Sequence, residues 1–117
     1  MSLETKLFTL LKTVCPRIYP DIAPNGTALP YVTWDQLGGI SIKPLDKTVP
    51  DKRQAVIQIN VWSKTRAEAN NLMLQIDSVL RQATVFSAQA ESEMQSMVDP
   101  DTEYRCAMQY FRITDLR

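Results

Sequence analysis

The sequence lacks histidine altogether and contains little cysteine and little glycine. Without histidine, the commonest general base and the commonest metal ligand are both missing. The two cysteines, Cys15 and Cys106, stand far apart with no CxxC pair, so a zinc site is not expected. We interpret both as buried, reduced thiols in preference to a disulfide. The three glycines form no phosphate-binding loop, and no cofactor is predicted.

An excess of charge and a long apolar run are also missing. Lys plus Arg equals Asp plus Glu at 13 each, so the basic excess of a nucleic-acid binder is absent. No stretch approaches the roughly 20 apolar residues of a membrane span. The first residues lack the basic start and apolar run of a signal peptide, so the expected location is cytoplasmic. The 117 residues, 44% of them apolar, predict one folded domain over 1–117.

Two stretches carry apolar residues at helical spacing. The first predicts a helix over about residues 3–14, with Ser2 as N-cap and Pro16 ending the pattern. The second predicts a helix over about 66–82, opened by a capping box of Thr65 and Glu68. Its apolar stripe consists of Ala69, Leu72, Met73, Ile76, Val79, Leu80 and Ala83.

The remaining segments favour strands and connections. Residues 16–30 carry four prolines and an Asn-Gly pair, which predict an extended, rigid linker. A strand is expected over about 31–37, broken by Gly38-Gly39, with a possible short strand starting at Ile40. The clearest strand covers Arg53 to Trp62, and the last third predicts a hairpin with one strand at about 94–98. Its second strand runs from Tyr104 to Ile113.

Alternation assigns the faces of two of these strands. In the strand 53–62, one face is an apolar core face and the other is mostly polar. The core face consists of Ala55, Ile57, Ile59 and Val61, and the other of Gln54, Val56, Gln58, Asn60 and Trp62. In the strand 104–113, Cys106, Met108 and Tyr110 share one face, and the opposite face, which is not cleanly polar, consists of Arg105, Ala107, Gln109, Phe111 and Ile113. The element order predicts an α+β fold: an antiparallel or mixed sheet of about four strands with two helices packed on one face.

The long connection 38–53 ends in a basic tip, formed by Lys43, Lys47, Lys52 and Arg53. Loops of this length are uncommon in compact domains unless they are functional or disordered. Two readings stay open: a solvated loop, or an arm that orders against a partner or near nucleic acid.

A second candidate surface lies on the sheet. Trp34 and Trp62 are either core or contact residues, and Trp62 falls on the polar-patterned face of its strand. Together with Val56, Phe111 and Ile113, Trp62 is predicted to form apolar surface on the side away from the helices, which would mark an interface. The carboxylates of the turn 99–103 suit either a cation or a solvated hairpin tip, and no nucleophile sits beside an identifiable base.

Three segments resemble one family. "LPYVTWDQLGG" (Leu29–Gly39), "RQAVIQINVWSKTRAEANNLMLQIDSVL" (Arg53–Leu80) and "YRCAMQYFRI" (Tyr104–Ile113) occur in an order similar to the tail-terminator, or tail-completion, proteins of long-tailed phages and prophages. The shared pattern is Pro-Tyr opening a strand, an alternating strand ending in Val-Trp, a helix containing Glu-Ala, and a final Tyr-Arg strand. These are signatures of a fold and carry no catalytic residue.

The resemblance implies a sheet backed by two helices and a ring-forming subunit, typically of a hexamer. Such a ring caps the tail tube and joins it to the head-side connector, so the implied partners are further copies, the tail-tube protein and the connector. Sheets would face the lumen, through which DNA passes without specific binding. The implied location is the virion tail, after assembly in the host cytoplasm.

Two other classes of function stay open at this point. One is a small, non-catalytic ligand-binding or regulatory module of ferredoxin-like type, which would need a pocket between its helices or at a dimer seam. The other is an enzyme that relies on Ser, Lys, Tyr or carboxylates alone; a perturbed carboxylate or lysine in a cleft would favour it. We predict a protein that is not an enzyme.

Overall fold

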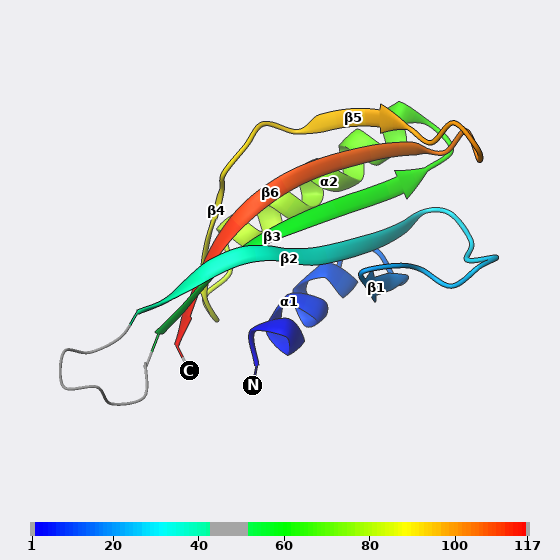
Figure 1. Cartoon of the computed structure of the whole chain (residues 1–117). Helices are drawn as coiled ribbons and strands as arrows, with labels where there is room; N and C mark the ends of the chain where they lie inside the picture. Colours follow the sequence, from blue (N-terminus) through cyan, green and yellow to red (C-terminus); the bar gives the residue numbers. More distant parts are fainter. Residues whose placement is uncertain (1, 43–51, 117) are drawn as a thin grey trace.

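A long, twisted sheet with both helices on one of its faces forms the body of the protein (Figure 1). The computed structural model describes residues 2–42 and 52–116. The elements in chain order are α1 (Leu3–Lys12), β1 (Ile18–Pro20), β2 (Tyr31–Ile42), β3 (Lys52–Ser63), α2 (Arg66–Arg81), β4 (Ser87–Ala90), β5 (Gln95–Val98) and β6 (Arg105–Leu116). In the described ranges, neither helix is both long and apolar enough to cross a membrane.

The sheet is mixed, as predicted, and its order is β1-β2-β3-β6-β4, with β5 also paired to β6. Only β1 runs parallel to its neighbour among the described pairings. The predicted number of about four strands is too low by the short strands β1 and β4. β1 was not predicted, because its segment is rich in proline. Pro20 is nevertheless compatible with an edge strand, where its missing N–H removes no hydrogen bond between strands. The α+β class with two helices on one face is confirmed.

β2 runs through the glycines that were predicted to break it. Its pairing with β3 shifts between Gln36 and Gly38, so that Leu37 is an extra, exposed residue. This is a β-bulge, which keeps the strand going while it changes which side chains face which way. The short strand expected at Ile40 is therefore the far half of β2.

The helices confirm their predicted stripes. α1 buries Leu3, Leu7 and Leu11, and α2 buries Ala69, Met73, Ile76 and Leu80. Ser2 caps α1 by accepting from the Thr5 amide at 3.1 Å. Thr65 caps α2 by accepting from the Glu68 amide at 3.2 Å, while the Glu68 carboxylate accepts a hydrogen bond from the buried Ser63 hydroxyl.

The register between β3 and β6 decides which faces meet the helices. Ile57 pairs with Phe111, and Ala55 pairs with Ile113. Paired residues in an antiparallel sheet point to the same side. Phe111 and Ile113 therefore lie on the core face with Ile57, and Phe111 is 0% exposed. The prediction that Phe111 and Ile113 join Trp62 on the helix-free side is wrong.

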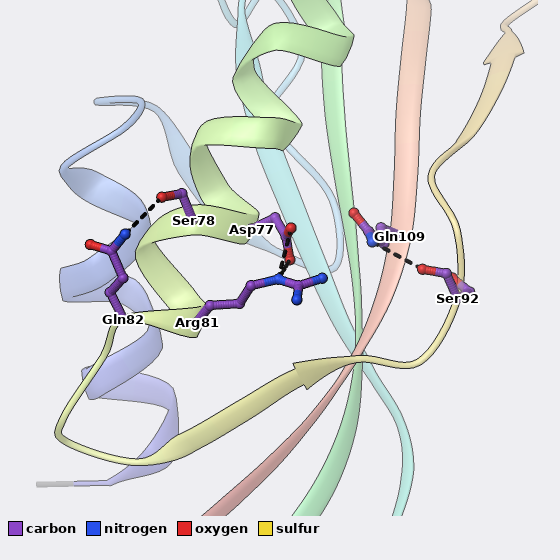
Figure 2. Close-up of polar contacts among 6 residues, drawn as sticks. All are labelled: Asp77, Ser78, Arg81, Gln82, Ser92 and Gln109. Atoms are coloured by element: carbon purple, nitrogen blue, oxygen red, sulfur yellow. Dashed lines mark hydrogen bonds and ion pairs between the residues drawn. The ribbon is translucent and has the colours of Figure 1, made fainter.

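Polar contacts close the two margins of this core. The Lys6 ammonium of α1 pairs with the Asp115 carboxylate of β6 at 2.6 Å, where both side chains are largely buried. At the other sheet edge, the segment between β4 and β5 is held by Ser92. Its carbonyl accepts from the Gln109 side chain at 2.9 Å (Figure 2), and its hydroxyl accepts from the Tyr110 amide at 3.2 Å.

Truncating Phe111 tests its position. We expect Phe111→Ala to lower the free energy of unfolding by about 3–5 kcal/mol, because it empties a fully buried site. The control is Phe8→Ala, since Phe8 is 39% exposed and should cost under about 1 kcal/mol. Urea denaturation followed by circular dichroism measures both. Equal, small losses would contradict the assignment of Phe111 to the core.

Candidate functional site

The face of the sheet away from the helices, here called the helix-free face, carries the candidate site. Residues at alternate positions of β2, β3 and β6 share this side because of the strand register. Its central members are Tyr31, Thr33, Asp35, Gln58, Asn60, Trp62, Cys106, Met108 and Tyr110. Most are polar and uncharged.

A hydrogen-bond network joins these side chains across β2 and β3. The Thr33 hydroxyl oxygen accepts from the Asn60 amide at 3.2 Å and lies 3.4 Å from the Trp62 indole nitrogen, which also donates to it. The Gln58 amide nitrogen donates to the Asn60 side-chain oxygen at 2.9 Å and lies 2.8 Å from the Met108 sulfur. Thr33 and Asn60 are buried, so this network orients the polar atoms of the face.

Toward β4, the charged side chain of Arg112 on the helix-free face is paired with a carboxylate. Arg112 forms an ion pair with Glu91 and donates to the Gln54 side-chain oxygen at 2.9 Å. The Gln54 nitrogen in turn lies 3.4 Å from the Thr114 hydroxyl. The face therefore offers neutral hydrogen-bonding groups, and it places no nucleophile beside a base in these contacts.

One end of the helix-free face is aromatic and hollowed. The rings of Tyr31 and Trp62 stack with their centroids 6.3 Å apart and their planes 27° apart. Beside Tyr31 lies an open hollow of about 250 Å³, which we call the end hollow. Its walls come from the segment between β1 and β2 and the turn between β5 and β6. They consist of Ile22, Ala23, Pro24, Asn25, Gly26, Thr27, Tyr31, Thr102 and Tyr104.

The titration of groups at this end reflects burial and acidic neighbours. Burial raises the pKa of the Tyr31 hydroxyl, and Tyr104, Asp99 and Cys106 raise it further. Burial raises the pKa of the Cys106 thiol to about 12, so this thiol stays protonated and unreactive at neutral pH. Cys15 and Cys106 are both buried and free, as expected.

A carboxyl pair flanks the end hollow. Burial raises the pKa of Asp35, and a hydrogen bond with Asp21 and the charge of Asp21 raise it further. Asp21 immediately precedes Ile22 of the hollow wall, and its amide donates to the Trp34 carbonyl at 2.9 Å. In the part of the chain that the structure describes, no group of three or more His, Cys, Asp or Glu could hold a metal.

The predicted site residues fall at different places. Trp62 lies half-buried on the helix-free face, as its alternation indicated, whereas Phe111 lies on the opposite face. Lys43 and Lys47 lie outside the described residues. Lys52 and Arg53 begin the 12-residue strand β3, and Trp62 lies near its opposite end. Of the basic tip, the structure therefore places Lys52 and Arg53 apart from Trp62.

Neither the end hollow nor the Thr33 network was predicted from the sequence. Thr33 could have been found, because Tyr31, Thr33 and Asp35 alternate just as the polar face of the strand 53–62 does. The hollow could not, because its walls come from segments about 80 residues apart in the chain. The hollow lies at the end of the sheet and not between the helices, which was one of the two places, with a dimer seam, where a ferredoxin-like ligand module was expected to hold a pocket.

Solved structures share this fold over nearly its whole length, among them the following two chains. One is a chain in a structure described as the virion of a native gene transfer agent particle, with a TM-score of 0.64 at 14% sequence identity. That match covers 99% of this chain and 96% of the other. A second solved chain matches at 10% identity with a TM-score of 0.52, and the match covers 99% and 97% of the two chains. At these identities, the likeness shows the shared fold.

The fold and the matched family together define the class, which is a structural protein of a phage tail. The chain belongs to the family described as Tail completion protein gp17, whose model matches residues 5–114. This match confirms the resemblance found in the sequence. No curated protein matches the chain in sequence.

Removing the Thr33 hydroxyl tests the network on the helix-free face. We expect Thr33→Val to lower the free energy of unfolding by about 1–3 kcal/mol, because Asn60 and Trp62 lose their shared acceptor in a buried place. The matched control is Thr9→Val on exposed α1, expected within about 0.5 kcal/mol of wild type. Urea denaturation compares them, and a loss no larger at Thr33 than at Thr9 would contradict the network.

The Asp21–Asp35 pair predicts a pH dependence. A raised folded-state pKa means that Asp35 stabilises the fold below its ordinary pKa and that this contribution is lost as pH rises through the raised value. Asp35→Asn should therefore raise the free energy of unfolding at neutral pH, and should raise it less near pH 3. Urea denaturation at a series of pH values measures the difference, with Asp101→Asn in the exposed turn as control. A variant that is less stable than wild type at neutral pH would contradict the prediction.

Proposed function

We propose that this protein caps the end of a phage or prophage tail tube as a ring-forming subunit and joins the tube to the head-side connector. The ring is a hexamer in this proposal, and its partners are further copies of the chain, the tail-tube protein and the connector protein. The observation that carries the proposal is the match of residues 5–114 to the tail-completion family.

The character of the helix-free face supports this role. A hexamer with cyclic symmetry has a central lumen, and a subunit with helices on one side and a long polar sheet on the other suits such a ring. Neutral amides and hydroxyls, with Arg112 already paired to Glu91, offer DNA no row of cations to bind. In this proposal the helix-free face lines the lumen, and DNA passes without specific binding.

The protein works by docking and without catalysis in this proposal. Tyr31, Asp35 and Cys106 are the groups of the site whose pKa is raised. In the contacts described above, none of them sits beside a base that would activate it. Trp62 and the basic residues Lys43, Lys47, Lys52 and Arg53 are the proposed contact residues. Assembly takes place in the host cytoplasm, and the protein then stays in the virion tail.

Deleting the gene tests the role in tail completion. Without the subunit, we expect heads and tails that fail to join, or tails of abnormal length, because no ring ends the tube. Electron microscopy of particles and the infectious titre measure both effects. The wild-type gene on a plasmid should restore them, and so should Phe8→Ala, a surface variant expected to fold. Tails of normal length joined to heads in the deletion strain would refute the proposal.

The same particles test the ring size. Native mass spectrometry or image classification of isolated tail ends should show six copies. A monomer of the isolated subunit at low concentration would not contradict the proposal, because the tail tube adds contacts that stabilise the ring.

A further inference from the structure

The end hollow has the chemistry of a docking site for a cationic segment. Tyr31 and Tyr104 present aromatic rings in its walls, and aromatic faces attract lysine and arginine. Ile22 is 81% exposed on the same wall, although it is a large apolar side chain. The walls therefore combine aromatic and apolar side chains with polar ones such as Asn25 and Thr102, which suits contact with a segment that carries both charged and apolar residues.

The charges around the end hollow indicate which kind of segment would bind there. The turn from Asp99 to Tyr104 carries three carboxylates and no cation, and the segment from Asp21 to Tyr31 carries one carboxylate and no cation. Thr102 and Tyr104 of this acidic turn line the hollow. Asp99 also lies near enough to the Tyr31 hydroxyl to raise its pKa. The Asp21–Asp35 pair adds negative charge at the same end. A basic segment with some apolar residues would complement this hollow.

This chain supplies such a segment at the opposite end of its sheet. In the run 43–53, "KPLDKTVPDKR", basic and apolar side chains alternate: Lys43, Leu45, Lys47, Val49 and Lys52. Arg53 follows as a further basic residue. Its four cations outnumber its two carboxylates. The run follows Ile42, the last residue of β2, and its last two residues, Lys52 and Arg53, begin β3.

The run cannot reach the hollow of its own chain. β2 has 12 residues, so it spans roughly 36 Å from Tyr31 beside the hollow to Ile42. The nine residues 43–51, tethered at both ends, reach at most about 17 Å beyond the sheet, or back along it, at about 3.4 Å per residue. The basic run and the end hollow can therefore meet only between two copies.

We propose that the end hollow binds the basic run 43–53 of a second copy of this chain, so that subunits associate head to tail. The contact is heterologous, because different surfaces of the two copies meet, and such contacts close into a ring when their rotation closes. This inference rests on the proposed ring and deepens it by naming the two surfaces that join.

A pair of charge-reversed variants tests this contact. The run-reversed variant keeps its hollow and carries Lys43→Glu, Lys47→Glu and Lys52→Glu. The hollow-reversed variant keeps its run and carries Asp99→Lys, Asp101→Lys and Glu103→Lys. Wild type should self-associate with rising concentration in sedimentation velocity, less so at high salt. Each variant alone should stay monomeric, because its run and its hollow then carry charge of the same sign. Their mixture should associate again, because each run then meets a hollow of opposite charge.

The control carries Lys12→Glu and Arg81→Glu, two changes on exposed helix positions, and should associate like wild type. Circular dichroism and urea denaturation establish that every variant folds. A second readout is Trp62, which stacks on Tyr31 at the hollow. With Trp62→Phe placed in the hollow-reversed partner, the remaining Trp62 of the run-reversed variant should change its emission on mixing.

Three results would overturn the inference: wild type that stays monomeric at every concentration, a reversed variant that associates as wild type does, or a mixture of the two variants that does not associate. The outcome is separable from that of the gene deletion. If charge reversal leaves association unchanged while the deletion strain lacks joined particles, only the docking contact fails. If the mixed variants pair but the deletion strain makes normal particles, only the tail-completion role fails.

Discussion

The register between β3 and β6 is the constraint on which the rest of the structure depends. It sets Ile57 beside Phe111 on the side that both helices cover, and thereby gathers the large apolar side chains of the two central strands into one core. A slip by one residue would turn every one of these side chains to the other face. The same register leaves Asn60 and Trp62 together on the helix-free face, where Thr33 accepts from both.

The elements with strong periodicity could be predicted from the sequence, and those without it could not. Both helices and the faces of β3 follow directly from their apolar spacing. β6 is apolar on both sides, with Met108 on one and Phe111 on the other, so alternation alone cannot say which side is buried. Pairing with β3 determines which side of β6 is buried. The bulge at Leu37 and the edge strand ending at Pro20 also depend on pairing with a neighbouring strand, so the local sequence does not predict them.

The candidate site was predictable only in part, for a related physical cause. Trp62 lies on the polar side of a clearly alternating strand, so its place on the helix-free face is visible in the sequence. The end hollow needs the turn at Thr102 to lie beside the segment at Ile22, and only the whole sheet brings them together. Phe111 was misassigned because its burial depends on Ile57 across the ladder. Surfaces built from one strand can be predicted, while surfaces built across strands need the fold.

The three 12-residue strands also give the molecule its length, 52 Å against widths of 26 and 23 Å. Substitutions farther apart than about 10 Å, with no shared partner, have effects that add. Residues around Tyr104 and residues around Lys52 stand at opposite ends of this length. Each end can therefore accumulate changes without altering the energetics of the other. Changes at one end can alter docking while they leave the core and the folding of the far end intact, and a contact between the two ends of neighbouring copies requires changes at both to match.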